Sequence, residues 1–352
     1  MLYFHIPFCR SICHYCDFFH SVAQGLRPSV IEAMARELVV RRDYLTETPQ
    51  TIYFGGGTPS AVPLSDIASL FELSRSTFGV SSFAEATIEC NPDDITPEYA
   101  LGLREVGFNR VSLGVQSFVD DHLRLMNRRH DGAQAQRAVE ILQQAGFNNI
   151  TIDLIYAMPF LSDEQWSYNL SRALALGVQH ISAYHLTLEG RTQFVRGGMV
   201  AVEGDVSQRH FDMLRSALLG GGFEHYEISN FALSGYRARH NTGYWLGEHY
   251  LGIGPSAHSF DGVSRCWNVC SNREYVDGRA AEVEILSATD RYNERLLTGL
   301  RMSDGVGDVD GALLDRASGF LASGDLVYDG SRLHIPSSRF LISDYIISSL
   351  FV

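Results

Sequence analysis

The alternation of short β-branched or aromatic runs with longer amphipathic stretches constrains the fold more than any other feature of the sequence. The apolar runs predict strands at Leu2–Ile6, Thr51–Phe54, Glu85–Cys90, Arg110–Val115, Thr151–Ile155 and Gln179–His185. Helical periodicity between them predicts helices near residues 28–45, 63–78, 97–106, 131–145 and 162–176. About six strand–helix repeats indicate an α/β fold with a parallel sheet and crossover helices. The pattern fits both a partial (β/α)6 barrel and a flat doubly wound sheet, and in either fold ligands bind at the carboxyl ends of the strands.

Residues with strong capping preferences mark the ends of several of these helices. Asp131 and Ser162 stand where side-chain caps of helix N-termini belong. Gly107, Gly146 and Gly177 each fall between a helical stretch and the next strand, the usual place of a C-terminal glycine cap. We therefore expect the helices to begin and end near these residues.

The last third of the chain follows a different pattern. A helix near 205–221 and a strand at Glu224–Ser229 are expected, after which residues 231–275 show little periodicity. Helical stretches at 290–301 and 308–322, a hairpin and a final helix then favour a smaller, mainly helical, winged-helix-like C-terminal domain. We therefore expect a barrel over residues 1–230, a connecting region over 231–289 and the C-terminal domain over 290–352.

Charge and hydropathy exclude some classes of partner and favour a cytoplasmic protein. The net charge is −13, which argues against a nucleic-acid partner bound through its phosphates. No apolar run reaches the roughly 18 residues of a membrane helix, and the N-terminus does not resemble a signal peptide. Because cytoplasmic thiols stay reduced, the six cysteines are expected to be metal ligands or free thiols.

Three of these cysteines, Cys9, Cys13 and Cys16, lie within eight residues directly after the first expected strand. Three thiolates can hold three irons of a [4Fe-4S] cluster and leave the fourth iron open to another ligand. The alternative is a zinc site completed by His5 or His14, although zinc sites usually combine a C-x2-C pair with a second pair of ligands. Cys90, Cys266 and Cys270 are expected to be free, buried thiols.

Glycines and polar residues follow the other strands. The second strand runs into Gly55-Gly56-Gly57-Thr58, where bare backbone could approach a ligand, although tight turns also use glycine. Glu89, Gln116 and Asp153 lie at the ends of later strands or inside them, and a buried carboxylate needs a partner. That partner is a ligand ammonium or hydroxyl, or else a structural cap or internal salt bridge. Arg128 could bind a carboxylate bidentately or lie on the surface in solvent.

Together these motifs resemble the radical S-adenosylmethionine (SAM) superfamily. The resemblance rests on the C-x3-C-x2-C triad, which follows Tyr-Phe-His-Ile-Pro-Phe, and on the Gly-Gly-Gly-Thr-Pro turn. Residues 107–116 and 152–155 resemble the oxygen-independent coproporphyrinogen III oxidase branch. The resemblance implies that the open iron of the cluster binds SAM through its amino and carboxylate groups. It also implies SAM contacts from Tyr3, Tyr15, Gly56, Gly57, Thr58, Glu89, Gln116, Arg128 and Asp153.

Two features separate the chain from the oxidases of that branch. The oxidases carry a further cysteine two positions after the triad, and here Asp17 and Phe18 follow Cys16. They also have an N-terminal extension before the first strand, whereas Tyr3 here is the third residue. Both features weigh against the propionate decarboxylation that the oxidases perform, so whether the chain is an enzyme stays open at this point.

A further motif resembles the HemW heme chaperone family. Residues 240–245, His-Asn-Thr-Gly-Tyr-Trp, match the H-N-x-x-Y-W motif that this family associates with heme binding. His240 could supply an imidazole to iron, and Tyr244 and Trp245 offer flat apolar faces to a porphyrin. The alternative is a loop histidine beside two core aromatics. The resemblance implies a chaperone that binds heme, SAM and a [4Fe-4S] cluster and passes heme to an acceptor protein, membrane-associated or not. The alternatives are coproporphyrinogen III oxidation and radical SAM chemistry on another substrate.

Overall fold

The computed structural model describes all residues, 1–352, and is built around one nine-stranded sheet of order β7-β8-β6-β5-β4-β3-β2-β1-β9. The strands are β1 (Leu2–Ile6), β2 (Thr51–Gly56), β3 (Glu85–Cys90), β4 (Arg110–Gln116), β5 (Ile150–Tyr156), β6 (His180–His185), β7 (Glu224–Glu227), β8 (Asn230–Ala232) and β9 (Leu251–Ile253). Strands β1 to β6 pair in parallel, β9 pairs in parallel with β1, and β7 and β8 form an antiparallel edge. Because β7 and β9 are not paired, the sheet is an open, partial barrel, as predicted.

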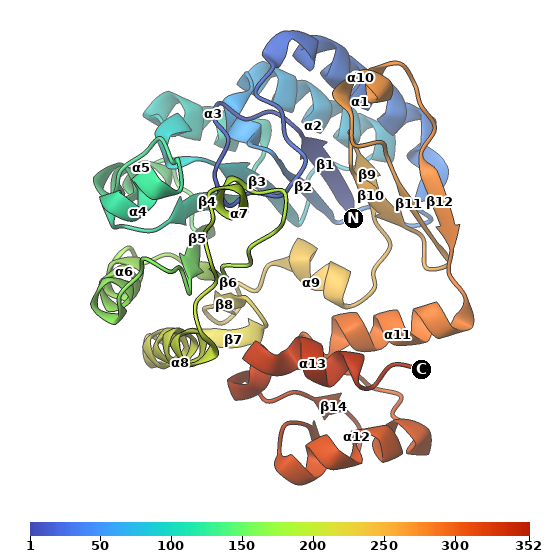
Figure 1. Ribbon diagram of the computed structural model, residues 1–352. Coiled ribbons are helices and arrows are strands. Elements are labelled where there is room, and N and C mark those ends of the chain that lie inside the picture. Colours follow the sequence, from blue (N-terminus) through green and yellow to red (C-terminus); the bar gives the residue numbers. More distant parts are fainter.

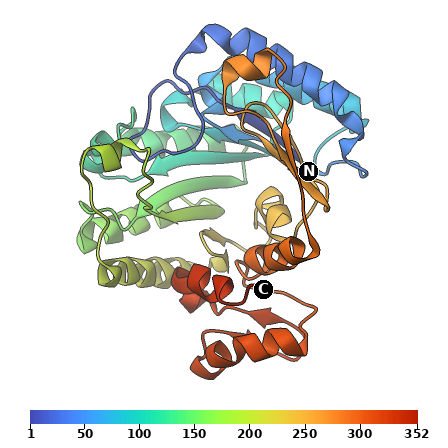
Figure 2. The ribbon, with the colours of Figure 1, turned by 45° about the vertical axis from the view of Figure 1, so that its right-hand side comes forward.

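Helices surround the outer face of the curved sheet (Figures 1 and 2). They are α1 (Arg27–Val40), α2 (Leu64–Phe78), α3 (Pro97–Val106), α5 (Gly132–Gln144), α6 (Asp163–Ala175) and α8 (Gly204–Gly220). The cap predictions are confirmed: Asp131 and Ser162 accept from the third residue of their helices, and Gly107, Gly146 and Gly177 have positive φ angles. Two short helices, α4 (Asp120–Leu125) and α7 (Gln193–Arg196), were not predicted. None of the helices has both the length and the apolar composition needed to cross a membrane.

Aromatic side chains of the inner strands pack against the crossover helices. Phe4 and Phe54 occupy paired register positions on β1 and β2, and their rings stack with 4.6 Å between centroids. Phe54 also meets Phe71 of α2 and Phe108, which precedes β4. The strands are buried on both faces, which explains why they appear in the sequence as nearly continuous apolar runs rather than alternating ones.

The segment with little periodicity contains short elements. They are the helices α9 (Arg239–Trp245) and α10 (Asn272–Val276), and the three-stranded sheet of β10 (His258–Phe260), β11 (Ser264–Trp267) and β12 (Glu282–Ile285). Elements of three to seven residues are too short to produce a clear hydrophobic period, so the sequence did not predict them. Cys266 is buried on β11, but Cys270 is exposed, so the expectation that all three remaining cysteines are buried is wrong for Cys270.

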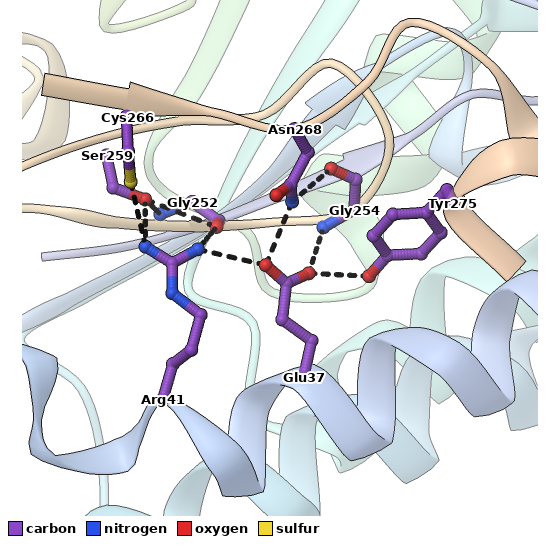
Figure 3. A network of polar contacts seen from close by, with 8 residues as sticks. All are labelled: Glu37, Arg41, Gly252, Gly254, Ser259, Cys266, Asn268 and Tyr275. Carbon is purple, nitrogen blue, oxygen red and sulfur yellow. Dashed lines mark hydrogen bonds and ion pairs between the residues drawn. The ribbon is translucent and has the colours of Figure 1, made fainter. Parts of the chain in front are cut away.

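A polar network fastens this segment to α1 (Figure 3). The Glu37 carboxylate accepts from Arg41 at 2.9 Å, the Asn268 amide at 2.9 Å, the Gly254 N–H at 3.0 Å and the Tyr275 hydroxyl at 2.5 Å. Arg41 also donates to the hydroxyl of Ser259, to the sulfur of Cys266 and to the carbonyl of Gly252. The network therefore fastens β9 and the segment that follows it to α1.

The C-terminal part follows the predicted order of helix, helix, hairpin and helix. Its elements are α11 (Ala288–Gly299), α12 (Gly311–Ser323), β13 (Val327–Tyr328), β14 (Leu333–His334) and α13 (Ser343–Ser348). In place of one continuous final helix, the structure has a 3-10 helix at Ser337–Ile342 followed directly by α13. The chain after α11 attaches to the sheet edge through Ile228 N–H to Arg301 O (3.0 Å) and Ser303 N–H to Tyr226 O (2.9 Å).

Candidate functional site

The cysteine-bearing loop follows β1 and lies over the carboxyl ends of the parallel strands. Cys9, Cys13 and Cys16 are free thiols that line one cavity of about 580 Å³, which we call the cluster cavity. The loop turns back on itself: Cys9 N–H donates to Ser21 O at 3.0 Å and Cys16 N–H to Cys13 O at 3.2 Å. Nowhere in the chain do three His, Cys, Asp or Glu side chains form a group able to hold a metal ion. A [4Fe-4S] cluster presents a separate iron to each sulfur, so its ligands need not converge on one point.

The two histidines of the zinc alternative, His5 and His14, do not line the cluster cavity. His5 lies with Nδ1 3.1 Å from the Tyr3 hydroxyl and Nε2 2.9 Å from Phe19 O. The Nδ1 atom of His14 lies 2.8 Å from Leu125 O at the end of α4. Neither nitrogen of His5 could ligate a metal without breaking one of these hydrogen bonds. The donor set around the cavity therefore fits a cluster held by three thiolates better than a zinc site.

The glycine turn allows β2 to pass close under the cysteine loop. Gly57 N–H donates to Ile6 O and Thr58 N–H to Phe8 O, each at 2.9 Å. A Cβ atom at Gly57 would lie 2.9 Å from Ile6 O and from Phe8 N, and one at Gly56 would lie 2.7 Å from the His5 ring. Gly56 and Gly57 therefore have two roles: they leave room for the main chain and side chains packed against them, and they line the cluster cavity. The Thr58 hydroxyl lies 3.4 Å from the sulfur of Cys9.

Two carboxylates, on the strands β3 and β5 that flank β4, line the cluster cavity without an ion-pair partner. Glu89 accepts from the Tyr53 hydroxyl at 2.7 Å and from Gly56 N–H at 3.2 Å, and burial raises the pKa of its carboxyl to about 7. Asp153 accepts from the Ser112 hydroxyl at 3.4 Å, and burial raises its pKa to about 6. The internal salt bridge left open from the sequence is absent at both residues. Both carboxylates are therefore able to accept from the hydroxyls or ammonium of a ligand.

Gln116 has an unusual backbone conformation, and Arg128 is held in place by hydrogen bonds of its side chain. Gln116 ends β4 with a φ angle of 68°, where the pairing of β4 with β5 shifts its register. Non-glycine residues with such angles often mark functional sites. The Arg128 guanidinium donates to Asn91 Oδ1 at 2.7 Å, Gly114 O at 2.6 Å and the Cys13 sulfur at 3.4 Å, and its Nε has no partner. Arg128 is thus not the solvated surface arginine that the sequence left open.

The cluster cavity collects most of the residues expected to contact SAM. Besides the three cysteines, it is lined by Tyr15, Gly56, Gly57, Thr58, Glu89, Gln116, Arg128 and Asp153. Tyr3 does not line the cavity. Its hydroxyl is instead hydrogen-bonded to His5, and its ring centroid lies 6.1 Å from that of Tyr53. The residues expected from separate strands therefore meet at one place, apart from Tyr3.

The model of the radical SAM superfamily matches residues 3–170. A Mycobacterium tuberculosis protein named heme chaperone HemW is 34% identical over 99% of this chain and 94% of its own length. HemW proteins of Lactococcus lactis (35% identical) and Escherichia coli (31% identical) each match 86% of this chain and 82% of their own length. The chain belongs to the HemW family. The structure of E. coli coproporphyrinogen III oxidase, described as a radical SAM enzyme, superimposes on all of this chain and 89% of its own with a TM-score of 0.87. At 22% identity this similarity shows a shared fold.

The motif shared with the HemW family lies on α9, apart from the cluster cavity. His240 is 1% exposed, with Nδ1 2.8 Å from the Thr51 hydroxyl and Nε2 3.0 Å from the Tyr244 hydroxyl. The main-chain N–H of His240 donates to the carboxylate of Glu85 at 2.8 Å. Tyr244 and Trp245 line a second cavity of about 890 Å³. The motif forms a helix rather than a loop, and both aromatics border a cavity.

Among the lining residues of the cluster cavity that the sequence analysis did not single out, Asn91 and Ser112 contact residues that it did. Asn91 accepts from Arg128, and Ser112 donates to Asp153. Ser112 lies on β4 four residues before Gln116, a spacing that places residues of a regular strand on one face. Asn91 directly follows the end of β3 in Glu-Cys-Asn-Pro, and this strand-end position was the available signal.

Proposed function

We propose that this HemW family member binds heme and a SAM-liganded [4Fe-4S] cluster, and transfers the heme to an acceptor protein. The observation that carries the proposal is the meeting of three free cysteines with eight of the nine residues expected to contact SAM in one cavity. The H-N-x-x-Y-W motif at residues 240–245 and the names of the HemW relatives support the heme part.

The residues of the cluster cavity would bind two groups, the [4Fe-4S] cluster and SAM. Cys9, Cys13 and Cys16 would each hold one iron, and the cluster would supply an open iron for the amino and carboxylate groups of SAM. Arg128 is placed to neutralise the carboxylate of that ligand, since its Nε is unpartnered. Glu89 and Asp153 are placed to accept from its ammonium and ribose hydroxyls. Burial of these groups limits competing water.

The proposal also covers the location of the protein, its macromolecular partner and its domains. We place the protein in the cytoplasm, with an acceptor protein rather than a nucleic acid as its macromolecular partner. We divide the chain into a cluster-bearing barrel (1–230), a connecting region with the heme motif (231–289) and a C-terminal winged-helix-like domain (290–352). The middle segment also contributes β9 to the large sheet.

Anaerobic reconstitution with iron and sulfide tests the cluster. The wild-type protein should take up about four irons per chain and show cluster absorbance, whereas the Cys9→Ser/Cys13→Ser/Cys16→Ser variant should not. Cys270→Ser is the matched control, because Cys270 is an exposed thiol outside the cavity. Zinc uptake in place of iron, or equal iron uptake by the triple variant, would contradict the assignment. Hemin titration with and without SAM then tests heme binding, and saturable Soret changes are expected.

A second candidate function, oxygen-independent coproporphyrinogen III oxidation, is favoured by the fold shared with the E. coli oxidase. The residue in place of the oxidases' extra cysteine, Phe18, is 73% exposed and lines the cluster cavity, where it can offer no thiol. An anaerobic assay with reductant, SAM and coproporphyrinogen III separates the candidates. Formation of protoporphyrinogen would favour the oxidase, whereas saturable hemin binding without product favours the chaperone.

A further inference from the structure

Arg110 is a buried cation without a carboxylate partner. It begins β4, and only 1% of its surface is exposed. Its Nη2 atom donates to the Thr151 hydroxyl of β5, and its Nε atom has no hydrogen-bond partner. No carboxylate oxygen lies within 4.0 Å of the guanidinium nitrogens. Because an isolated buried charge is costly, a guanidinium in this position needs negative charge in the layers around it.

The strand pairing places Arg110 one layer below the two carboxylates of the cluster cavity, Glu89 and Asp153. Residues two positions apart on a strand point to the same face, so Arg110 shares a face of β4 with Ser112. Ser112 pairs in register with Glu89 of β3 and donates to Asp153 of β5 at 3.4 Å. Thr151, which accepts from Arg110, lies two residues before Asp153. The separation between these layers is roughly 7 Å, the rise of two strand residues.

Opposing influences set the pKa values of the two carboxyls. Burial is the largest, and it leaves the pKa of Glu89 raised to about 7 and that of Asp153 raised to about 6. The negative charge of Asp153 also raises the pKa of Glu89. Hydrogen bonds from Tyr53 and Ser182, together with the positive charge of Arg110, lower these pKa values. Arg110 therefore offsets part of the cost of holding two negative charges inside the barrel.

The other titratable groups that face the two carboxylates do not replace this charge. Four phenols face them from β1, β2, β6 and α9, namely Tyr3, Tyr53, Tyr184 and Tyr244. Burial and the nearby carboxylates raise the pKa of each phenol, so all four are neutral near pH 7. The thiols of Cys9 and Cys90 lie near Glu89, and burial raises their pKa values too. Arg128 lowers the pKa of Asp153, whereas Arg110 lowers that of both carboxyls.

Two further buried acids of the large sheet have donors of their own. Glu85 of β3 accepts from two main-chain N–H groups at the start of α9, at 2.8 and 2.9 Å. Glu227 of β7 accepts from Ser229 N–H at 3.1 Å, and the positive charge of Arg301 lowers its pKa against the larger effect of burial. Neither acid therefore depends on Arg110 as its main source of stabilisation.

We propose that Arg110 is a positioning residue of the SAM site, whose buried charge keeps the carboxyls of Glu89 and Asp153 ionised. The inference rests on the proposed SAM-liganded cluster and adds a residue that touches neither group, since Arg110 does not line the cluster cavity. Hydrogen bonds to an ionised acceptor are about twice as strong as those to a neutral one. Ionised Glu89 and Asp153 would therefore hold the amino group and ribose hydroxyls of SAM more tightly than their protonated forms.

Infrared spectra of the reconstituted, SAM-free protein between pH 5 and pH 9 measure the protonated carboxyls directly. Glu89→Gln and Asp153→Asn identify the two bands. Arg110→Met and Arg110→Gln remove the charge and should move both midpoints up by about one pH unit, whereas Arg110→Lys should restore them. Thr151→Val removes only the hydrogen-bond acceptor of Arg110 and is the control. Wild-type midpoints in both charge-free variants, or an equal shift in Thr151→Val, would overturn the proposal.

Calorimetric titration with SAM at several pH values tests the consequence for binding. In the charge-free variants of Arg110, SAM affinity should be lower than in the wild type by roughly three- to tenfold at pH 7 and should approach the wild-type value at pH 8.5. Iron uptake should be unchanged, because the cysteine loop is intact. An equal loss of affinity at every pH would show a merely structural role. No SAM binding by the wild type would refute the proposed function, while the infrared midpoints would still decide the role of Arg110.

Discussion

The ring of Tyr53 stacks on the imidazole of His240 with 5.1 Å between ring centroids, and the Tyr53 hydroxyl donates to Glu89 at 2.7 Å. Glu89 lines the cluster cavity, and His240 is hydrogen-bonded to Tyr244, which lines the second cavity. The side chain of Tyr53 on β2 therefore contacts both a residue that lines the cluster cavity, Glu89, and a residue of the H-N-x-x-Y-W motif, His240. The two cavities are therefore connected through one side chain of the large sheet.

Replacement of Tyr53 by phenylalanine should weaken SAM binding and leave the fold intact. The substitution keeps the ring that stacks on His240 but removes the donor that holds Glu89 Oε1. Loss of a hydrogen bond to a charged group costs about 1.5–3 kcal/mol, so SAM affinity should fall by roughly 10- to 100-fold. Calorimetric titration of the reconstituted protein checks this. Equal SAM affinity in the wild type and Tyr53→Phe would show that the hydrogen bond from Tyr53 is not needed to orient the Glu89 carboxylate for SAM binding.

The pKa of Glu89 predicts how stability depends on pH. Because burial raises this pKa from 4.5 to about 7, the folded state favours the protonated carboxyl. The contribution of Glu89 to stability is therefore greatest at or below pH 4.5 and is lost as the pH rises toward 7. Glu89→Gln should remove this loss, so that the SAM-free variant is more stable than the wild type above pH 7 by up to about 3 kcal/mol.

Urea unfolding at several pH values measures the Glu89 effect. The difference in unfolding free energy between Glu89→Gln and the wild type should grow from pH 5 to pH 8. Glu105→Gln, on the exposed end of α3, provides the comparison and should show no such growth. A constant difference across the range would mean that Glu89 is charged throughout.

Removal of Glu37 should destabilise the fold strongly. Glu37→Ala leaves Arg41, whose side chain is 19% exposed, without its carboxylate and leaves Tyr275, Asn268 and Gly254 without an acceptor. Loss of one partner of a buried pair costs about 3–5 kcal/mol. Glu32→Ala removes an exposed i,i+4 pair with Arg36 on the same helix and should cost less than about 0.5 kcal/mol. Similar midpoints of chemical unfolding for the two variants would contradict the importance of the network.

A methyl group at Gly57 should prevent normal cluster assembly. Its Cβ would lie 2.9 Å from Ile6 O and Phe8 N, so the cysteine loop would have to move away from β2. Overpacking of this kind costs about 1–3 kcal/mol, and iron uptake by Gly57→Ala should fall. Gly25→Ala is the matched control, because nothing lies within 4 Å of a Cβ there. Full iron content in Gly57→Ala would show that the loop adapts.

The sequence predicted the barrel and its cavity residues well because long elements repeat a clear pattern. The six predicted parallel strands are all present, and Glu89, Gln116 and Asp153 meet at their carboxyl ends. The burial of His240 could not be predicted, because it depends on Thr51 and Glu85, which lie more than 150 positions earlier in the chain. The local sequence pattern contains no information about contacts between residues so far apart in the chain. For the same reason the pairing of β9 with β1 could not be predicted.

The pairing of β1 with β9 has a consequence for how the protein is made. Strand β1 carries the cysteine loop at its end, but its neighbour on the outer side, Leu251–Ile253, is synthesised much later. Until that segment is synthesised, one edge of β1 and its unpaired amides stay open to other chains. Metal loading in the cell should therefore follow, rather than accompany, most of translation, and chains that stall before this segment should be substrates for chaperones and proteases.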